Sequence, residues 1–391
     1  MNWSFPTTIW FGPGRLSELS TAAAETGMRR PLVVTDRGLA GFSFVEQAAT
    51  LVGAVDIFSD VDANPTGENV DAGVACFRNA DADGVVAVGG GSAMDVGKLI
   101  AFAQGQTLSL WDFEDIGDRW KAANPATIAP VIAIPTTAGT GSEVGRAGVV
   151  TETATHTKRI IFHPAMLPRV VIADPELTVG LPPALTAGTG MDALAHNLEA
   201  LCAPGYHPMC DGIATEGMRL IFENLEVVCR DGANLEARGH LMSAASMGAV
   251  AFQKGLGAIH SLSHPVGSLC GTHHGTTNAV FMPYVLAFNR SAIEPRIERL
   301  SAVLGIAGGF DGFMSRVLSL RSAIDMPHAL SELGVSPNRV PAIASMSVDD
   351  PTAASNPVAF DENDATAMLE AALSGDIEAA ARAGAGRSPR A

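Results

Sequence analysis

The sequence has little charge, and that charge is unevenly balanced. Only 17% of its residues are charged, and 41 Asp and Glu residues outnumber 25 Lys and Arg residues, which gives a formal net charge of −16. No block of Lys and Arg offsets this excess, so the chain would repel nucleic acids and anionic membrane surfaces. We therefore expect neither partner. Small anionic ligands are not excluded, because they respond to the local charge of a pocket.

Cysteine and long apolar runs are scarce as well. The five cysteines are odd in number and form no CxxC pair, so we predict neither a disulfide framework nor a zinc knuckle built from thiolates. No stretch of about 18 or more apolar residues suggests a membrane span. The N-terminal sequence MNWSFPTTIWFGPGRL lacks the basic start and the continuous apolar run of a signal peptide. We expect a globular protein of the cytoplasm.

What the chain does have is a 47% share of hydrophobic residues over 391 positions, which supports a large core and favours two domains. In the first half, short apolar segments alternate with helical ones, at RPLVVTDRGL (30–39), DGVVAVGGGSAMDVGKLIAFA (83–103), APVIAIPTTAGTGSEVG (129–145) and RVVIADPELT (169–178). Strands that are apolar throughout and separated by helices indicate a parallel sheet covered on both faces. We predict a Rossmann-like α/β domain over residues 1–182.

The pattern changes near residue 182. Helical spacing dominates from there on, as in TEGMRLIFENLEVV, where four apolar residues follow the i, i+3, i+4, i+7 rule, and strand signals nearly vanish. We predict an all-helical second domain over residues 183–391. Its Ala-, Gly- and Arg-rich end, residues 381–391, is expected to be frayed.

Two glycine-rich loops follow predicted strands. The first places Gly89, Gly90, Gly91 and Ser92 between a strand and a helix, where free N–H groups of the first helical turn can hold phosphate oxygens. The second, TTAGTGSE (136–143), follows the next strand. A triple glycine can also form a tight turn without a ligand, and it is not the GxGxxG fingerprint. Because both loops lie at the carboxyl ends of parallel strands, they favour a bound dinucleotide.

Asp36 ends the predicted strand VVTD. A carboxylate at this place can accept hydrogen bonds from both ribose hydroxyls of an adenosine and would repel a 2′-phosphate. Aspartate is also a common residue at the start of a turn. Together with the two loops, Asp36 favours NAD over NADP.

Histidine is concentrated in the second half of the chain. GMDALAHNLEA places Asp192 and His196 four residues apart on a helix, IHSLSHPVG repeats this spacing with His260 and His264, and His274 follows in HHG. A single histidine on an apolar face is usually a core residue. Two such pairs with almost no charge nearby instead favour a divalent ion, and a carboxylate with imidazoles suits Fe²⁺ or Zn²⁺.

Several motifs together resemble the iron-containing (group III) alcohol dehydrogenases. In the family's order they are VVTD, AVGGGSAMDVGK, PTTAGTGSEV, ADPELT, GTGMDALAH, GLGAIHSLSHPVG and HHGTTNAVFMP, and DDPTAASNP (349–357) resembles the family's C-terminal Asn-Pro segment. The resemblance implies the fold that this family shares with dehydroquinate synthase. It also implies an Fe²⁺ ion, with Zn²⁺ or another divalent metal as the alternative, and NAD as the coenzyme, with NADP less favoured.

The resemblance assigns roles to individual residues. It implies four metal ligands, which are Asp192, His196, His260 and His274, and it places His264 near the nicotinamide. It also implies a set of nucleotide contacts at Asp36, Gly89, Gly90, Gly91, Ser92, Asp95, Thr136, Thr137, Gly139, Thr140, Ser142 and Lys158. His273 stands where relatives often carry proline, so we do not predict it to be a fifth ligand.

These roles predict hydride transfer without a covalent nucleophile. A divalent ion favours ionisation of an alcohol, and the hydride then passes to the nicotinamide; in reverse, the ion polarises an aldehyde carbonyl. His264 is predicted to relay the alcohol proton, and the alternative is that it only orients substrate or coenzyme.

Two cations, Arg146 and Lys254, depart from the common family pattern and suggest a substrate with a remote carboxylate. The run MSAASMGAVAFQKGLGAIHSLSHPVG resembles the 4-hydroxybutyrate dehydrogenase branch, so an ω-hydroxy acid and its semialdehyde form the leading hypothesis. A plain short-chain primary alcohol is the runner-up. In that case Arg146 pairs with Glu143 or with coenzyme phosphates, and Lys254 faces solvent.

Three other classes of protein compete with this interpretation. They are a dehydroquinate-synthase-like lyase, a maleylacetate-reductase-like enzyme, and a non-catalytic protein that retains the fold. The apolar character of the helical half also predicts a homodimer or a higher homo-oligomer.

Overall fold

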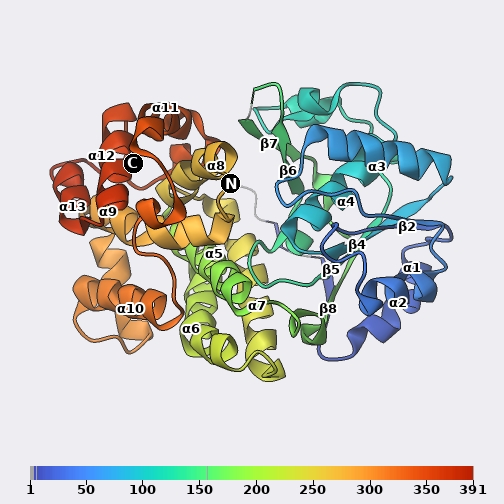
Figure 1. The fold of residues 1–391 in the computed structure, drawn as a ribbon, viewed down its shortest axis with the longest axis horizontal. Coiled ribbons are helices and arrows are strands. Elements are labelled where there is room, and N and C mark those ends of the chain that lie inside the picture. Colours follow the sequence, from blue (N-terminus) through green and yellow to red (C-terminus); the bar gives the residue numbers. More distant parts are fainter. Residues whose placement is uncertain (1–3, 6, 156, 391) are drawn as a thin grey trace. The chain divides into compact units, whose positions relative to one another are not determined.

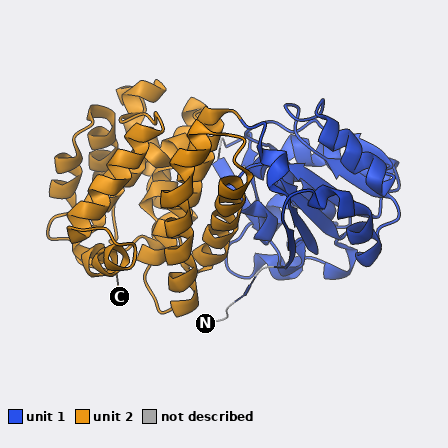
Figure 2. Cartoon of the chain, turned by 90° about the horizontal axis from the view of Figure 1, so that it is seen from below, with its two compact units in different colours: residues 1–181 blue, residues 182–391 orange. Residues whose placement is uncertain are grey.

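The computed structural model describes residues 4, 5, 7–155 and 157–390. The chain divides into two compact units, residues 1–181 and residues 182–391 (Figure 2). This division falls one residue before the boundary expected from the sequence.

Unit 1 is built on a six-stranded parallel sheet with the strand order β1-β8-β5-β4-β2-β3 (Figure 1). Its strands are β1 (Thr8–Phe11), β2 (Pro31–Val34), β3 (Asp56–Phe58), β4 (Gly84–Gly89), β5 (Val131–Pro135) and β8 (Val170–Ala173). The four strands that the sequence predicts as apolar runs are β2, β4, β5 and β8, and every residue in them is buried. The prediction of a Rossmann-like α/β domain is confirmed.

Both faces of this sheet are covered, as expected for apolar parallel strands. On β2, Leu32 and Val34 face a core formed with α3 (Gly67–Asn79) and α4 (Gly91–Ala103). Val33 faces the opposite core, formed with α1 (Leu19–Glu25) and α2 (Ser43–Val52). Figure 1 shows the two helical layers on either side of the sheet.

Unit 1 also contains a two-stranded antiparallel hairpin that the sequence does not predict. It consists of β6 (Ala147–Glu152) and β7 (Thr157–Phe162), which pair along their full length. Most of its residues are only partly buried, so its sequence carries no continuous apolar run. The short strands β1 and β3 escape prediction for the same reason, since each has exposed positions.

Apart from loops and an isolated bridge between Val358 and Pro389, the described residues of unit 2 form helices, which confirms the all-helical prediction. Its α-helices are α5 (Pro183–Cys202), α6 (Pro208–Arg230), α7 (Leu235–Ala251), α8 (Ala258–Cys270), α9 (His274–Val303), α10 (Gly309–Ala323), α11 (Val340–Asp349), α12 (Glu362–Ser374) and α13 (Ile377–Gly384). Helix α5 packs against α6, α7 and α9 (Figure 1). From Thr186 to Cys202 it is buried at every position except Thr189.

Residues 381–390, for which the sequence predicts a frayed tail, make specific contacts with other parts of the chain. Helix α13 continues to Gly384, whose backbone packs so closely on α9 that a Cβ there would lie 2.0 Å from the carbonyl oxygen of Phe288. Beyond the helix, Arg387 pairs with Asp364, and the N–H of Arg390 donates to the carbonyl of Pro357 at 2.8 Å. Composition alone does not reveal these contacts, because their partners lie elsewhere in the chain.

Among the residues that the structure describes, no helix has both the length and the apolar character needed to cross a bilayer.

Candidate functional site

Two carboxylates and an imidazole interrupt the buried surface of α5. Asp192, His196 and Glu199 are 2%, 5% and 5% exposed, and their spacing of four and three residues places them on one face of the helix. Buried polar groups require partners. This face of α5 must therefore meet polar groups from other helices, and α8 and α9 provide them.

Helix α8 contributes His260 and His264, one turn apart. His260 is buried, with its Nε2 atom 3.8 Å from Asp192 Oδ1, and its ring stacks on that of His196 with centroids 4.7 Å apart. The i, i+4 spacing seen in the sequence thus places both histidines on the side of α8 that faces the buried carboxylate.

Helix α9 begins with His274, and a glycine explains how it reaches α5. A Cβ on Gly275 would lie 2.1 Å from the carbonyl oxygen of Gly188, a separation that no side chain tolerates. Glycine at this position lets the first turn of α9 lie directly on α5. The close approach brings His274 Nε2 to 3.4 Å from Asp192 Oδ1.

The four predicted metal ligands are brought together around one oxygen atom. Asp192 Oδ1 lies 3.8, 3.8 and 3.4 Å from the Nε2 atoms of His196, His260 and His274. Ligands held at about 2.1 Å by one tetrahedral ion are separated by about 3.4 Å. Ligand atoms of Asp192, His260 and His274 also lie within 4.8 Å of one another. One carboxylate and three imidazoles at these distances fit a divalent ion such as Fe²⁺ or Zn²⁺.

The electrostatics of this cluster favour a cation. Burial alone would raise the pKa of Asp192, but the neighbouring imidazoles outweigh burial and hold that pKa far below its ordinary range. Burial would likewise lower the pKa of His260, yet the carboxylates of Glu199 and Asp192 outweigh it and raise the pKa to about 9. The cluster therefore stabilises positive charge at the place where the imidazoles face Asp192.

Asn278, one turn after His274 on α9, also contacts the cluster. Its Nδ2 atom lies 2.8 Å from Asp192 Oδ1, 3.3 Å from His260 Nε2 and 3.2 Å from His274 Nε2. The residue is fully buried, and its Oδ1 atom has no hydrogen-bond partner among the described residues. The amide therefore helps to fix the Asp192 carboxylate from the side of α9.

His264 lies beside the cluster, and a second carboxylate orients it. Its ring stacks on His274 with centroids 5.4 Å apart, and its Nδ1 atom lies 2.8 Å from Asp350 Oδ2. The other oxygen of Asp350 accepts hydrogen bonds from the backbone N–H and the hydroxyl of Thr352. Burial would raise the pKa of Asp350, but His264 and Thr352 outweigh burial and lower it. With Nδ1 engaged, Nε2 of His264 is the atom left for proton transfer.

His273 has a separate place from the four ligands. It precedes the first residue of α9, and its Nδ1 atom accepts a hydrogen bond from the N–H of Thr276 at 3.3 Å. Burial lowers the pKa of its imidazole. A helix cap explains this histidine without a metal.

In unit 1 the two predicted nucleotide loops touch each other. The N–H of Thr136 donates to the carbonyl of Gly89 at 3.0 Å, and a Cβ on Gly91 would lie 2.6 Å from Thr140 Cγ2. Gly91 is also the first residue of α4, so the loops meet where a helix presents its free N–H groups. Both loops leave the carboxyl ends of neighbouring strands, β4 and β5.

Asp36 lies next to the first of these loops. Its Oδ1 atom accepts hydrogen bonds from the N–H groups of Gly38 and Leu39, at 2.8 and 3.1 Å, and thereby closes the turn after β2. Its Oδ2 atom would lie 3.4 Å from a Cβ on Gly89. One oxygen thus stabilises the turn, and the other is directed at the glycine loop.

Asp95 supports the second loop from inside. Its carboxylate accepts hydrogen bonds from the Ser142 hydroxyl at 2.5 Å and from the Val149 N–H at 3.0 Å, and it pairs with the buried Lys98 at 3.1 Å. Lys98 in turn donates to the carbonyls of Ser142 and Ala147. These contacts hold the loop in place, a role distinct from direct contact with a nucleotide.

The two cations expected near the substrate are already engaged. The ammonium of Lys254, whose side chain is only 1% exposed, pairs with Asp211 at 2.5 Å and donates to the carbonyl of Leu201. The ammonium does not face solvent and has Asp211 as its anionic partner, so its charge is balanced within unit 2. The guanidinium of Arg146 lies over the ring of Phe162 at 5.4 Å and donates to Ser4. Lys158, the remaining expected contact, lies in β7 opposite Thr151.

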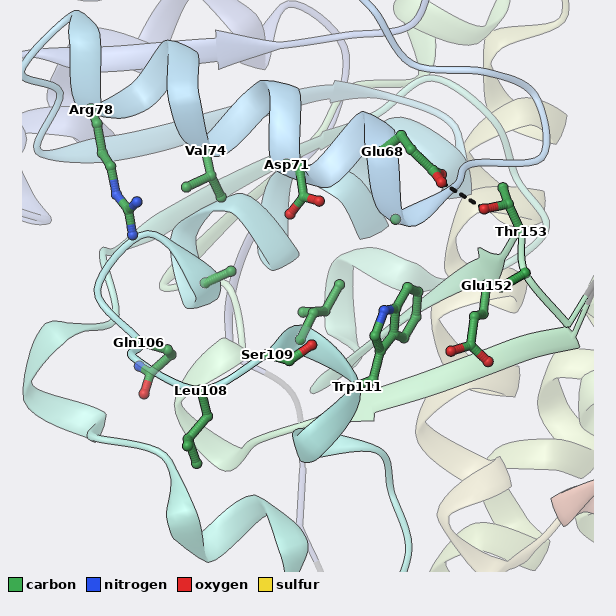
Figure 3. A pocket seen from close by; sticks show the side chains of 14 residues that line it. Glu68, Asp71, Val74, Arg78, Gln106, Leu108, Ser109, Trp111, Glu152 and Thr153 are labelled. Atoms are coloured by element: carbon green, nitrogen blue, oxygen red, sulfur yellow. Dashed lines mark hydrogen bonds between the residues drawn. The ribbon is translucent and has the colours of Figure 1, made fainter.

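A cavity of about 380 Å³ opens elsewhere on unit 1 (Figure 3). Glu68, Asp71 and Glu152 line it together with Trp111, and Thr153 donates to Glu68 at 2.6 Å. No residue that the sequence singled out borders this cavity, and its carboxylates disfavour phosphate.

Three residues of the site escape prediction from the sequence, namely Glu199, Asn278 and Asp350. Glu199 does carry a signal, since it is a polar residue on the face of α5 that carries Asp192 and His196. Asn278 carries a similar signal, because it lies one turn after His274 on α9. Asp350 gives no local signal, because its partner His264 lies 86 residues away in the chain.

Comparison with known proteins agrees with this geometry. Residues 6–175 match the family described as iron-containing alcohol dehydrogenase, and residues 186–373 match the C-terminal part of the Fe-containing alcohol dehydrogenase family. A 4-hydroxybutyrate dehydrogenase of Cupriavidus necator is 38% identical, over 94% of this chain and 98% of its own.

Solved structures give the same result. A 1,3-propanediol oxidoreductase superposes with a TM-score of 0.90 at 34% identity and covers 95% of this chain and 99% of its own. A sulfoacetaldehyde reductase from Bifidobacterium kashiwanohense, solved with NAD⁺, gives 0.87 at 30% identity and covers 96% and 99%. A maleylacetate reductase from a Rhizobium strain is less similar, with a TM-score of 0.79 at 29% identity and coverage of 96% and 98%. The chain belongs to the iron-containing alcohol dehydrogenase family, as the motifs of its sequence imply.

Proposed function

We propose that the protein is a metal-dependent, NAD-linked dehydrogenase of short primary alcohols that works in reverse as an aldehyde reductase. The observation that carries this proposal is the position of Asp192 Oδ1, within 3.8 Å of three imidazole nitrogens. Membership of the family supports the same reaction, and the iron-containing relatives favour Fe²⁺ over Zn²⁺, although the ligands suit both.

Asp192, His196, His260 and His274 would hold the ion. When bound, a divalent metal supplies Lewis acidity, which stabilises negative charge on the oxygen of an alcohol or an aldehyde. The residues of the chain do the rest. Asp192 and the imidazoles set the charge of the site, and Asn278 holds the Asp192 carboxylate through its amide.

His264 is proposed to accept the alcohol proton in the oxidation and to return it in the reduction. Its Nδ1 atom is engaged by Asp350, which keeps a proton on that nitrogen and leaves the Nε2 lone pair free. The same arrangement operates where a carboxylate orients a general-base histidine in other enzymes.

The coenzyme is proposed to bind at the glycine loops of unit 1. The N–H groups at the start of α4 would contact the pyrophosphate. Gly91 packs so closely on Thr140 that a side chain at position 91 would not fit without a shift of Thr140. The free oxygen of Asp36 would accept hydrogen bonds from the adenosine ribose, which favours NAD over NADP. The NAD⁺-bound relative supports this choice.

For the substrate we propose an ω-hydroxy acid such as 4-hydroxybutyrate and its semialdehyde. The support is the 38% identity to a 4-hydroxybutyrate dehydrogenase. Of the two cations that the sequence suggests, only Arg146 is retained as a contact for the carboxylate. The pairing of Lys254 with Asp211 favours the second candidate, an uncharged short alcohol, because it removes one of the two positive charges.

Steady-state kinetics with metal-loaded protein and NAD would test these proposals. We expect NADH to accumulate with 4-hydroxybutyrate, kcat/KM to exceed that for 1-butanol, and Arg146→Ala to reduce the ratio. Lys254→Met, measured in parallel, should leave it unchanged. A preference for butanol in the unmodified protein, or an unchanged ratio in Arg146→Ala, would contradict the hydroxy-acid proposal.

The same assay separates the remaining reaction classes. A dehydroquinate-synthase-like lyase regenerates its NAD, so net NADH formation would exclude it, and failure to turn over maleylacetate would exclude the reductase. A location in the cytoplasm and a homo-oligomeric state stay predictions. Mass photometry of the purified protein would test the latter.

A further inference from the structure

Glu199 has no role in the site described so far, yet it touches one of the proposed metal ligands. It lies on α5 seven residues after Asp192 and is buried. Its Oε2 atom lies 2.6 Å from the Nδ1 atom of His260, on the opposite side of that ring from Asp192. Helix α5 thus carries two proposed ligands and a carboxylate in contact with a third.

The carboxylate of Glu199 is held by a second contact. Its Oε1 atom accepts a hydrogen bond from the N–H of Ile259 at 2.7 Å, in the first turn of α8. The neighbouring N–H, that of Ala258, donates to Asn356 Oδ1 at 3.0 Å. A Cβ on Gly257 would lie 3.0 Å from Glu199 Oε1, so the chain before α8 fits closely against the carboxylate. Both oxygens of Glu199 are therefore occupied by donors from α8.

This geometry determines which nitrogen of His260 carries a proton. A carboxylate oxygen can only accept, so Nδ1 must donate, and the lone pair of the neutral ring is on Nε2. Nε2 is the atom that faces Asp192. A metal ligand is the neutral nitrogen without a proton, so in the neutral ring the contact with Glu199 makes Nε2 the atom that can bind an ion.

We propose that Glu199 is a positioning residue of the metal site, which selects the tautomer of His260, fixes the plane of its ring and strengthens its Nε2 atom as a ligand. The inference rests on the proposed metal site and goes beyond it, since Glu199 itself binds no ion. The competing interpretation is that Glu199 only anchors the start of α8 against α5.

Glu199→Gln distinguishes the two interpretations. Glutamine has nearly the same shape, but its amide offers one acceptor oxygen to two donors, Nδ1–H and the Ile259 N–H. If the oxygen keeps the backbone bond, the amide NH₂ faces Nδ1 and forces the proton of His260 onto Nε2, where it blocks ligation. If the oxygen serves Nδ1, the backbone N–H is left without an acceptor.

Asn356→Ala is the matched structural control. Asn356 caps the same turn of α8 through Ala258, and it also exchanges hydrogen bonds with Asn289, but no described contact joins it to His260. Its loss should lower the thermal stability of the protein and leave the tautomer of His260 unchanged.

The experiment is a titration of the full-length, chelator-treated protein with Zn²⁺ against a chromophoric chelator. We expect Kd to be about 10- to 100-fold weaker in Glu199→Gln and within about threefold of the unmodified protein in Asn356→Ala. In ¹⁵N-histidine NMR spectra of the zinc-loaded unmodified protein, the resonance of His260 should show a protonated Nδ1. Glu199→Asp keeps the charge but is one methylene shorter, and its affinity should also fall.

Equal affinity in the unmodified protein and in Glu199→Gln would overturn the inference, as would a parallel loss of affinity in Asn356→Ala. If Glu199→Gln fails to fold, Glu199→Asp decides between the two interpretations, and unchanged affinity in it overturns the inference. Absence of zinc binding in the unmodified protein would instead refute the proposed metal site, and the inference with it.

Discussion

Asp350 and His264, which lie 86 residues apart in the sequence, meet with Oδ2 and Nδ1 at 2.8 Å beside the proposed metal ligands. The second oxygen of Asp350 is engaged by Thr352, so the carboxylate cannot turn away from the ring. His264 is therefore held in one orientation and one tautomer, and the described residues provide no hydrogen-bond partner for its Nε2 atom. This pairing brings the segment DDPTAASNP (349–357) into contact with a residue of the proposed site.

Asp350→Asn should lower kcat by about 10- to 100-fold without a comparable change in KM for NAD. The oxygen of the asparagine must serve the Thr352 donors, so its NH₂ would face Nδ1 and move the proton of His264 onto Nε2, where it cannot accept another. Asp349→Asn is the control, because Asp349 is the exposed neighbour in the chain. An unchanged kcat and pH profile in Asp350→Asn would show that His264 carries no proton in the rate-limiting step.

Metal affinity should rise with pH up to about pH 9. The carboxylates around His260 raise its pKa to about 9, so below that pH a proton occupies the ring in the metal-free protein and must leave when an ion binds. A raised pKa means that the protonated form is favoured, and the apparent Kd should weaken by about tenfold for each unit below pH 9. Competition titrations with Zn²⁺ at several pH values measure the slope. A flat profile between about pH 6 and pH 9 would contradict this assignment.

The sequence is sufficient for the parts of the site that depend on local spacing. Asp192 with His196, and His260 with His264, lie one turn apart on helices, so their shared faces follow from helical geometry alone. Strands that are apolar at every position reveal the buried centre of the sheet. The hairpin β6–β7 escapes prediction because its residues are only partly buried and show no such run.

Contacts between residues that are far apart in the sequence cannot be predicted from local spacing. Glu199 meets His260 over 61 residues, and Lys254 meets Asp211 over 43. Nothing in the local sequence of Lys254 indicates that its charge is balanced internally, and so the sequence alone suggests a cation available to a substrate. The contacts of residues 381–390 escape prediction for the same reason, since their partners Asp364 and Phe288 lie elsewhere in the chain.

Lys98→Met should destabilise unit 1 and loosen the second of the two proposed nucleotide loops. The ammonium of Lys98 is buried, pairs with Asp95 at 3.1 Å and donates to two backbone carbonyls of the loop region, so its removal leaves the Asp95 carboxylate and both oxygens with fewer partners. We expect a loss of about 2–4 kcal/mol in the free energy of unfolding and a higher KM for NAD. Urea unfolding and NAD kinetics measure the two effects. Lys121→Met, which removes an exposed pair with Asp118, should change neither, and an equal effect in both variants would refute the supporting role.

Gly91→Ala should weaken NAD binding, and the loss of affinity should be larger than the loss of folding stability can explain. The new Cβ would lie 2.6 Å from Thr140 Cγ2 and would also stand at the first residue of α4, where the backbone is proposed to contact the pyrophosphate. These two consequences can be separated by adding Thr140→Ala, which makes room for the methyl group within the fold. The double variant should regain thermal stability relative to Gly91→Ala and still show a KM for NAD raised about tenfold or more, because the methyl group remains at the first residue of α4, beside the N–H groups proposed to contact the pyrophosphate. Thr140→Ala alone sets the baseline for the lost hydroxyl.

A normal KM for NAD in the double variant, measured against that baseline, would contradict this prediction. It would mean that the methyl group disturbs only the packing of the two loops and that the pyrophosphate lies elsewhere.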